Sequence, residues 1–107
     1  MKPTDKRINF RKDGKVIGAA LLRDYHDGDI FLADYSISKE YRGQGLGRQT
    51  MNMLLSKYHV NCLSVAIDNQ VALHLYKSLG FEIVSDPYYD KNAGETLYYM
   101  RLPGHNY

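Results

Sequence analysis

Alternate glycines mark the stretch from Tyr41 to Gln49, where an apolar segment ending at Ile37 passes into an amphipathic segment that begins near Gly45. Glycine accepts positive backbone φ angles and leaves neighbouring amide N–H groups uncovered. A helix that starts here adds unpaired first-turn donors and the positive end of its dipole. The stretch therefore predicts a strand, a glycine loop and a helix that bind an anion such as a phosphate, with Arg42 and Arg48 supplying positive charge.

Hydrophobic periodicity around this loop predicts an α/β (α+β) fold. The pattern indicates strands over 7–11, 15–23, 30–37, 61–67, 81–85 and 95–102, and helices over 45–57 and 69–79. Asp13-Gly14 is a hairpin signal, and Asn69 and Gly80 suit the start and end of the second helix. The expected order is β-β-β-α-β-α-β-β, a mixed central sheet flanked by two helices.

Length and composition narrow the class of protein. A chain of 107 residues with 44% hydrophobic and 24% charged residues is typical of one soluble globular domain, here 1–107. The sequence has no apolar run of about 18 residues and no signal-peptide pattern near Met1, so we expect a cytoplasmic protein without a membrane partner. The single cysteine, Cys62, is expected to be a buried and unreactive thiol. A net charge of +2 does not indicate binding to nucleic acid.

Three phosphate-binding patterns can be compared with the glycine loop. A P-loop needs Gly-Lys-Ser/Thr, which the chain lacks. A dinucleotide fingerprint needs a third glycine five residues after the first, but those positions are Arg48 and Thr50. The pattern that fits is Arg-x-x-Gly-x-Gly, in the run Arg42-Gly43-Gln44-Gly45-Leu46-Gly47, and there the chain resembles the GNAT superfamily of N-acetyltransferases.

A second signature strengthens the resemblance, which covers roughly Lys15 to Leu102. Ile37-x-x-Glu40-Tyr41-Arg42-Gly43 looks like the family's entry to the loop, and Asn69-x-x-Ala72-x-x-x-Tyr76-x-x-x-Gly80-Phe81 looks like its later helix. The resemblance implies that acetyl-coenzyme A binds as co-substrate. The residues that it assigns to this ligand are Ser36, Ile37, Ser38, Arg42, Gly43, Gln44, Gly45, Leu46, Gly47, Arg48, Asn69, Ala72, Tyr76 and Lys77.

Within that set, the resemblance implies different roles. The amides of Arg42 to Gly47 would wrap the pyrophosphate, and the backbone of 36–38 would pair with the pantetheine arm like an added strand. Asn69 would hold the pantetheine near the thioester, or act only as a helix cap. Lys77 is either solvated or meets a phosphate of the ligand.

The implied reaction is direct attack of a primary amine on the thioester, without a covalent enzyme intermediate. Tyr76 falls where the family often places the phenol that protonates the departing thiolate, and a phenol remains a proton donor at neutral pH. Asp34 is the leading candidate for the base, either directly or through water, although it could equally point outward from the sheet. His74 is a weaker candidate, and no cluster has metal-ligand spacing, so we expect no metal.

The chain also departs from the family pattern. Lys39 stands where the family often has proline, and the usual first strand and helix pair, which form a wall of the acceptor site, are not found before the first expected strand. This wall is therefore either absent or supplied by a partner. If it is absent, we expect an open acceptor side that suits a protein lysine or N-terminus better than an enclosed small molecule. Pairing through the exposed first strand could form a homodimer. The alternative is a non-catalytic module that binds coenzyme A or another protein.

Overall fold

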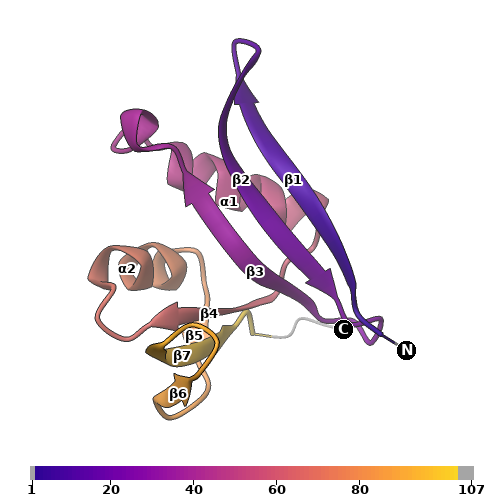
Figure 1. The fold of residues 1–107 in the computed structure, drawn as a ribbon, viewed down its shortest axis with the longest axis vertical. Helices are drawn as coiled ribbons and strands as arrows, with labels where there is room; N and C mark the ends of the chain where they lie inside the picture. The colour runs from indigo at the N-terminus through magenta and orange to yellow at the C-terminus, as the bar shows by residue number, and fades with distance from the viewer. Residues whose placement is uncertain (1, 104–107) are drawn as a thin grey trace. The chain divides into compact units, whose positions relative to one another are not determined.

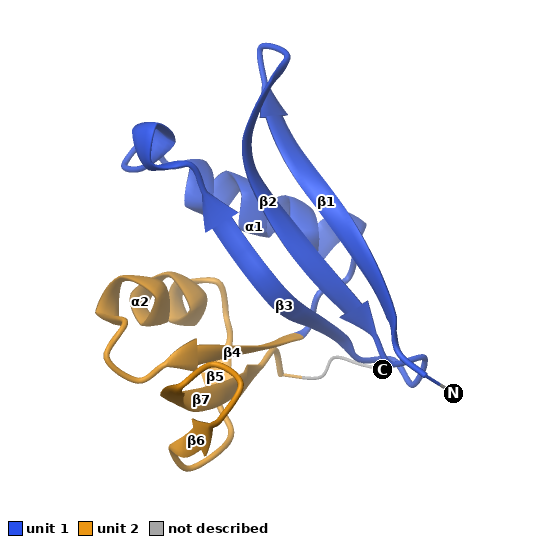
Figure 2. Cartoon of the chain, viewed as in Figure 1, with its two compact units in different colours: residues 1–61 blue, residues 62–107 orange. Residues whose placement is uncertain are grey.

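The computed structural model describes residues 2–103 and divides the chain into two compact units, 1–61 and 62–107 (Figures 1 and 2). The described residues contain seven strands and two α-helices, which confirms the predicted α+β class. In chain order the elements are β1 (Thr4–Lys12), β2 (Lys15–Asp24), β3 (Ile30–Ile37), the short 3-10 helix η1 (Lys39–Tyr41), α1 (Leu46–Lys57), β4 (Cys62–Ala66), α2 (Gln70–Ser78), β5 (Glu82–Ile83), β6 (Tyr88–Asp90) and β7 (Glu95–Arg101). Neither helix is long and apolar enough to cross a membrane.

The first unit is an antiparallel meander of β1, β2 and β3 with α1 on one of its faces (Figure 1). Asp13 and Gly14 form the first hairpin with φ angles of 52° and 80°, the left-handed conformation that Asp-Gly pairs favour. Alternate side chains of the strands and the inner side of α1 make the core of the unit. Its most buried members include Phe10, Ile17, Ala20, Leu22, Met51 and Leu54.

Two β-bulges bend this meander. On β2 the register skips Ile17, because Phe10 lies opposite Gly18 while Arg11 lies opposite Val16. On β3 it skips Ala33. An extra residue bends a strand and increases its local twist, and bulges are common beside active sites. Both strands are therefore distorted within a few residues of the end of β3, where the glycine loop begins.

Asn61 ties the end of the first unit back to the start of β3. Its side-chain oxygen accepts from the Ile30 amide at 3.0 Å, and its side-chain nitrogen donates to the Gly28 carbonyl at 3.0 Å. The Asn61 amide also donates to the Ile30 carbonyl at 3.1 Å. Three hydrogen bonds thus fix the chain that leaves α1.

The second unit is built on β7, which pairs antiparallel with β4, β5 and β6. Asn69 caps α2, since its side-chain oxygen accepts from the Ala72 amide at 3.1 Å, and the chain leaves the helix through Gly80 at a φ of 103°. Phe81 then folds back, 2% exposed, and its amide donates to the Tyr76 carbonyl at 3.0 Å. The predicted cap and glycine stop are confirmed. Cys62 is buried, as expected.

One strand was missed. Tyr88–Asp90 forms β6, so the order within the described residues is β-β-β-α-β-α-β-β-β, where the sequence predicted two strands after the second helix. A three-residue strand has too few positions to show an alternating pattern, and two of its three residues are exposed tyrosine side chains.

Candidate functional site

The glycine loop presents bare backbone to solvent. Gly43 and Gly45 have φ angles of 80° and 75°, in the left-handed region that favours glycine, and Gly45 is the N-cap of α1. A Cβ atom built on either glycine would meet nothing within 4 Å. The backbone conformation therefore favours glycine here, and the open space beside it lets an anion approach the amides.

The first turn of α1 is also suited to negative charge. No side chain caps the helix at Gly45, and the first turn contains no acidic residue. The amides of Leu46 and Gly47 have no acceptor within the helix, as at every helix start, and they add to the positive end of the dipole. Loop and helix start thus present mainly backbone N–H groups, which are the donors that suit an anion.

Arg42 is held by the strand that leads into the loop. Its Nε–H donates to the Ile37 carbonyl at 3.0 Å, and its amide donates to the Lys39 carbonyl at 3.3 Å. The side chain is exposed. The bond to Ile37 uses Nε and does not involve the two terminal nitrogens of the guanidinium. Arg42 therefore shapes the loop as well as placing positive charge beside it.

The end of β3 directs its backbone groups to alternate sides. The Ser38 amide donates to the Ile17 carbonyl at 2.7 Å, and Ser36 lies opposite Ala19 in the register, so the backbone groups of both serines face β2. Successive residues of a strand point their N–H and C=O groups in opposite directions. Of the three residues predicted to meet pantetheine, Ile37 is therefore the one whose backbone points away from β2.

A network missed at the level of sequence joins β3 to α1. The Tyr35 hydroxyl lies 2.7 Å from Thr50 Oγ1, and Thr50 Oγ1 in turn donates to the Leu46 carbonyl at 2.8 Å. Tyr35 OH also lies 3.2 Å from the Gly47 carbonyl, to which it can donate. Burial raises the pKa of the Tyr35 phenol. The network fixes the first turn of α1, and no local pattern indicates it because its partners lie fifteen residues apart.

Asp34, the candidate base, is exposed on β3 beside the bulge at Ala33. One carboxylate oxygen accepts from the Tyr35 amide at 2.9 Å. The side chain is therefore held by its own strand and is open to solvent.

The remaining predicted residues lie on or beside α2 in the second unit. Asn69 uses its side-chain oxygen for the cap, which leaves its side-chain NH2 group outside that bond. Tyr76 is 8% exposed and packs edge-on against Phe81, with ring centroids 6.1 Å apart. Lys77 and His74 are exposed, and Ala72 is half-buried. Residues 2–103 include no group of three or more His, Cys, Asp or Glu side chains that could hold a metal ion.

Comparison with known proteins defines the class to which this fold and loop belong. The profile of the acetyltransferase (GNAT) family matches residues 2–81. The chain belongs to this family, as the two signatures at 37–47 and 69–81 predicted.

Individual relatives are similar over part of their length. The chain is 30% identical over 105 residues to the N-alpha-acetyltransferase RimI of Mycobacterium tuberculosis, covering 92% of this chain and 66% of the relative. It is 30% identical over 83 residues to the L-amino acid N-acyltransferase MnaT of Escherichia coli, covering 69% of this chain and 48% of the relative. The chain thus spans between about half and two thirds of these two proteins.

Solved structures share the fold. The ribosomal-protein-S18-alanine N-acetyltransferase of Escherichia coli superposes with a TM-score of 0.76 at 27% identity, covering 96% of this chain and 74% of that one. A GNAT family acetyltransferase from Elizabethkingia anophelis, solved with acetyl-CoA bound, gives a TM-score of 0.72 at 15% identity, covering 92% of this chain and 75% of that one.

Proposed function

We propose that this protein is an acetyl-coenzyme A-dependent N-acetyltransferase that transfers the acetyl group to a primary amine by direct attack. The observation that carries the proposal is the glycine loop at 42–47, with two left-handed glycines, open space beside them and no acid in the first turn of α1. Membership of the GNAT family supports acyl transfer as the class of reaction.

The residues present fit acetyl-coenzyme A. The amides from Gly43 to Gly47 would bind its pyrophosphate, with Arg42 and the exposed Arg48 supplying charge. The backbone of Ile37 would pair with the pantetheine arm, and the side-chain NH2 group of Asn69 would bind a pantetheine carbonyl. The co-substrate supplies the activated acetyl thioester, and the protein supplies binding, orientation and proton transfer.

Two side chains are proposed to move protons. Tyr76 would donate its phenolic proton to the departing thiolate, and its edge-on packing against Phe81 would hold the ring in one orientation. Asp34 would accept the proton of the acceptor amine, directly or through a water molecule, with the carboxylate oriented by its bond from the Tyr35 amide. Lys77, exposed in the last turn of α2, is proposed to meet a phosphate of the ligand.

The acceptor is proposed to be the α-amino group of a peptide or protein. Two relatives support this choice by name, the N-alpha-acetyltransferase RimI and the ribosomal-protein-S18-alanine N-acetyltransferase. A third relative is named L-amino acid N-acyltransferase MnaT, so a single amino acid is the competing acceptor. We further propose a cytoplasmic location and a homodimer paired through β1, whose partner among the described strands is β2 alone.

A thiol-release assay tests the proposed activity. Acetyl-coenzyme A is incubated with peptides that carry a free N-terminus, the same peptides blocked at the N-terminus, single L-amino acids and spermidine. Unblocked peptides should release thiol above the hydrolysis background, and Tyr76→Phe should reduce kcat about 10²-fold or more, the usual contribution of a positioned general acid. Tyr98→Phe, a half-buried tyrosine on β7, is the matched control and should leave kcat unchanged.

Binding measured alongside separates the enzyme from a non-catalytic module. Tight binding of acetyl-coenzyme A with no acceptor releasing thiol would contradict the enzyme and favour the module. Full activity of Tyr76→Phe would agree with an N-acetyltransferase but would show that Tyr76 is not its general acid.

A further inference from the structure

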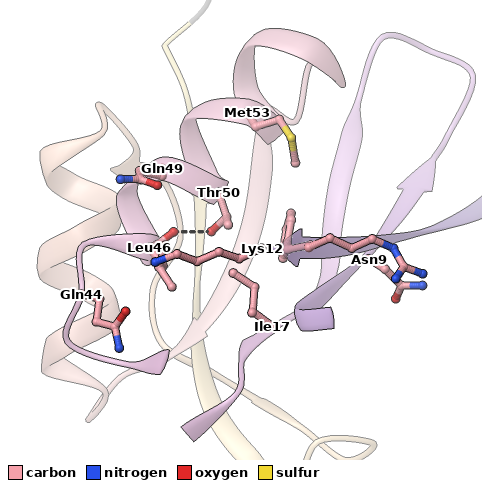
Figure 3. A pocket seen from close by; sticks show the side chains of 10 residues that line it. Asn9, Lys12, Ile17, Gln44, Leu46, Gln49, Thr50 and Met53 are labelled. Atoms are coloured by element: carbon pink, nitrogen blue, oxygen red, sulfur yellow. Dashed lines mark hydrogen bonds between the residues drawn. The ribbon is translucent and has the colours of Figure 1, made fainter. Parts of the chain in front are cut away.

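A pocket of about 390 Å³ lies in the first unit (Figure 3). It is lined by residues of β1, β2 and α1 and by Gln44 of the glycine loop. Residues 9–12 of β1 line one side, and Ile17 of β2 contributes to the floor. The other side is lined by Gln44, Leu46, Gln49, Thr50 and Met53. The volume is at the small end of the range of about 300–1,000 Å³ that is typical of ligand pockets. Its size therefore suits a molecule much smaller than coenzyme A.

The floor of the pocket is apolar. Phe10, Ile17 and Leu46 line it and are 4%, 3% and 7% exposed. Thr50 also lines it, but its hydroxyl is engaged with the Leu46 carbonyl and with Tyr35. The interior thus offers surface to a hydrocarbon or aromatic group and few unmet hydrogen-bonding groups.

The rim of the pocket carries positive charge. Arg11 and Lys12 are exposed residues at the end of β1, and neither makes an ion pair with any other residue in 2–103. No carboxylate lines the pocket, and Gln44 and Gln49 supply side-chain amides on the opposite side. In Figure 3 the Lys12 side chain reaches from β1 toward the side of the pocket where Leu46 and Gln44 lie.

We propose that this pocket binds a small organic anion with an apolar body, such as an aryl or alkyl carboxylate, next to the proposed acetyl-coenzyme A site, which uses the backbone amides of the lining residues Gln44 and Leu46. The apolar floor takes the body, and Lys12, which lies on the same face of β1 as Phe10, binds the charged head. A cation would meet this like charge, and a neutral ligand would leave it unused. The proposal rests on the pocket alone and stands whether or not the protein is an acetyltransferase.

Titration of the 15N-labelled protein with 4-phenylbutyrate, followed by amide NMR, tests the proposal. Saturable shifts should centre on the amides of Lys12, Gln49 and Met53. Lys12→Gln should weaken binding about five-fold or more, as expected for the loss of one charge-assisted contact. Lys15→Gln is the matched control, because this exposed lysine of the same hairpin does not line the pocket, and it should bind as the unmodified protein does.

Titrations with two other ligands and with one further variant test the chemistry of the ligand. The uncharged 4-phenylbutyramide should bind at least about five-fold more weakly than the acid. Phenyl phosphate distinguishes the head group, since tighter binding than the carboxylate would assign the pocket to phosphate esters of the same anionic class. Met53→Trp, which fills the pocket from α1, should abolish binding.

Three results would overturn the proposal. The first is the absence of saturable shifts at the pocket amides. The second is equal binding of the acid and the amide, or of the unmodified protein and Lys12→Gln. The third is displacement of 4-phenylbutyrate by saturating acetyl-coenzyme A, which would make the pocket part of the co-substrate site.

Discussion

Arg42 donates its Nε–H to the carbonyl oxygen of Ile37 at 3.0 Å, so the arginine of the glycine loop is bonded to the last residue of β3. The bond joins the residue proposed to pair with pantetheine to a residue proposed to meet the pyrophosphate. It holds the guanidinium beside the loop. The loop is therefore preorganised by its own arginine.

Replacing Arg42 should weaken binding of acetyl-coenzyme A. Arg42→Ala removes both the bond to Ile37 and the charge, and a charge-assisted contact is worth about 1.5–3 kcal/mol, so the Kd should rise roughly ten- to a hundred-fold. Arg42→Lys keeps the charge without the planar guanidinium. Its Kd should lie between those of the unmodified protein and Arg42→Ala. Isothermal titration calorimetry measures the effect, with the exposed Arg7→Ala on β1 as control. An unchanged Kd in Arg42→Ala would show that the arginine does not contribute to the site.

A methyl group at Gly18 should destabilise the first unit. A Cβ atom there would collide with the Ser36 carbonyl oxygen and would lie 3.0 Å from Ile37 Cδ1 and 3.1 Å from Ile37 Cα. Backbone cannot yield as a flexible side chain can, so Gly18→Ala should cost roughly 1–3 kcal/mol in urea denaturation. Gly14→Asn is the control, because its side chain enters open space and Asn tolerates left-handed φ. Equal stability of Gly18→Ala and the unmodified protein would refute the close approach of β2 and β3.

The hydroxyls of Tyr35 and Thr50 should stabilise the first unit jointly. Tyr35→Phe and Thr50→Val should each lower the free energy of unfolding by about 1 kcal/mol, with the double variant losing less than the sum because both remove the same 2.7 Å bond. Tyr89→Phe, at a side chain that is 65% exposed, should have no effect. Strict additivity in a double-mutant cycle would mean that the two hydroxyls do not interact.

The second unit should lose stability at high pH through Tyr99. Partial burial, followed by the hydrogen bond with the Cys62 thiol, raises the pKa of Tyr99 to about 12, from an ordinary value near 10. Between these values the unfolded chain releases this proton while the folded chain keeps it, so the contribution is complete below pH ~10 and is lost as the pH rises toward ~12. Thermal midpoints across this window should fall more steeply for the unmodified protein than for Tyr99→Phe. Parallel pH profiles would contradict the raised pKa.

Much of the fold could be predicted because its signals are local. The alternation at 7–11, the Asp13-Gly14 turn and the helical spacing after Gly45 each reflect the preference of a few adjacent residues, and the observed elements agree within a few positions. The Asn69 cap could be predicted for the same reason. What was missed depends on partners far apart in the chain, such as the Tyr35–Thr50 bond and the two bulges, or on a strand as short as β6.

The geometry of the glycine loop was predictable to the same extent. Spacing of the glycines identified a loop whose φ angles and open surroundings suit an anion. Spacing did not indicate that Arg42 would bond to Ile37, or that the serines on either side of Ile37 would direct their backbone to β2. Those properties follow from the register between β2 and β3, which a single sequence does not specify. The roles of Tyr76 and Asp34 stay predictions.

The most direct test of the central claim, that the loop binds the pyrophosphate of acetyl-coenzyme A, compares Gly45→Asp with Gly45→Asn by isothermal titration calorimetry. Asp and Asn have nearly the same shape and both tolerate left-handed φ, so the pair isolates a negative charge at the start of α1. The account predicts a Kd within about threefold of the unmodified protein for Gly45→Asn, and a Kd at least about tenfold higher for Gly45→Asp. Equal affinity of the two variants for acetyl-coenzyme A would contradict the claim.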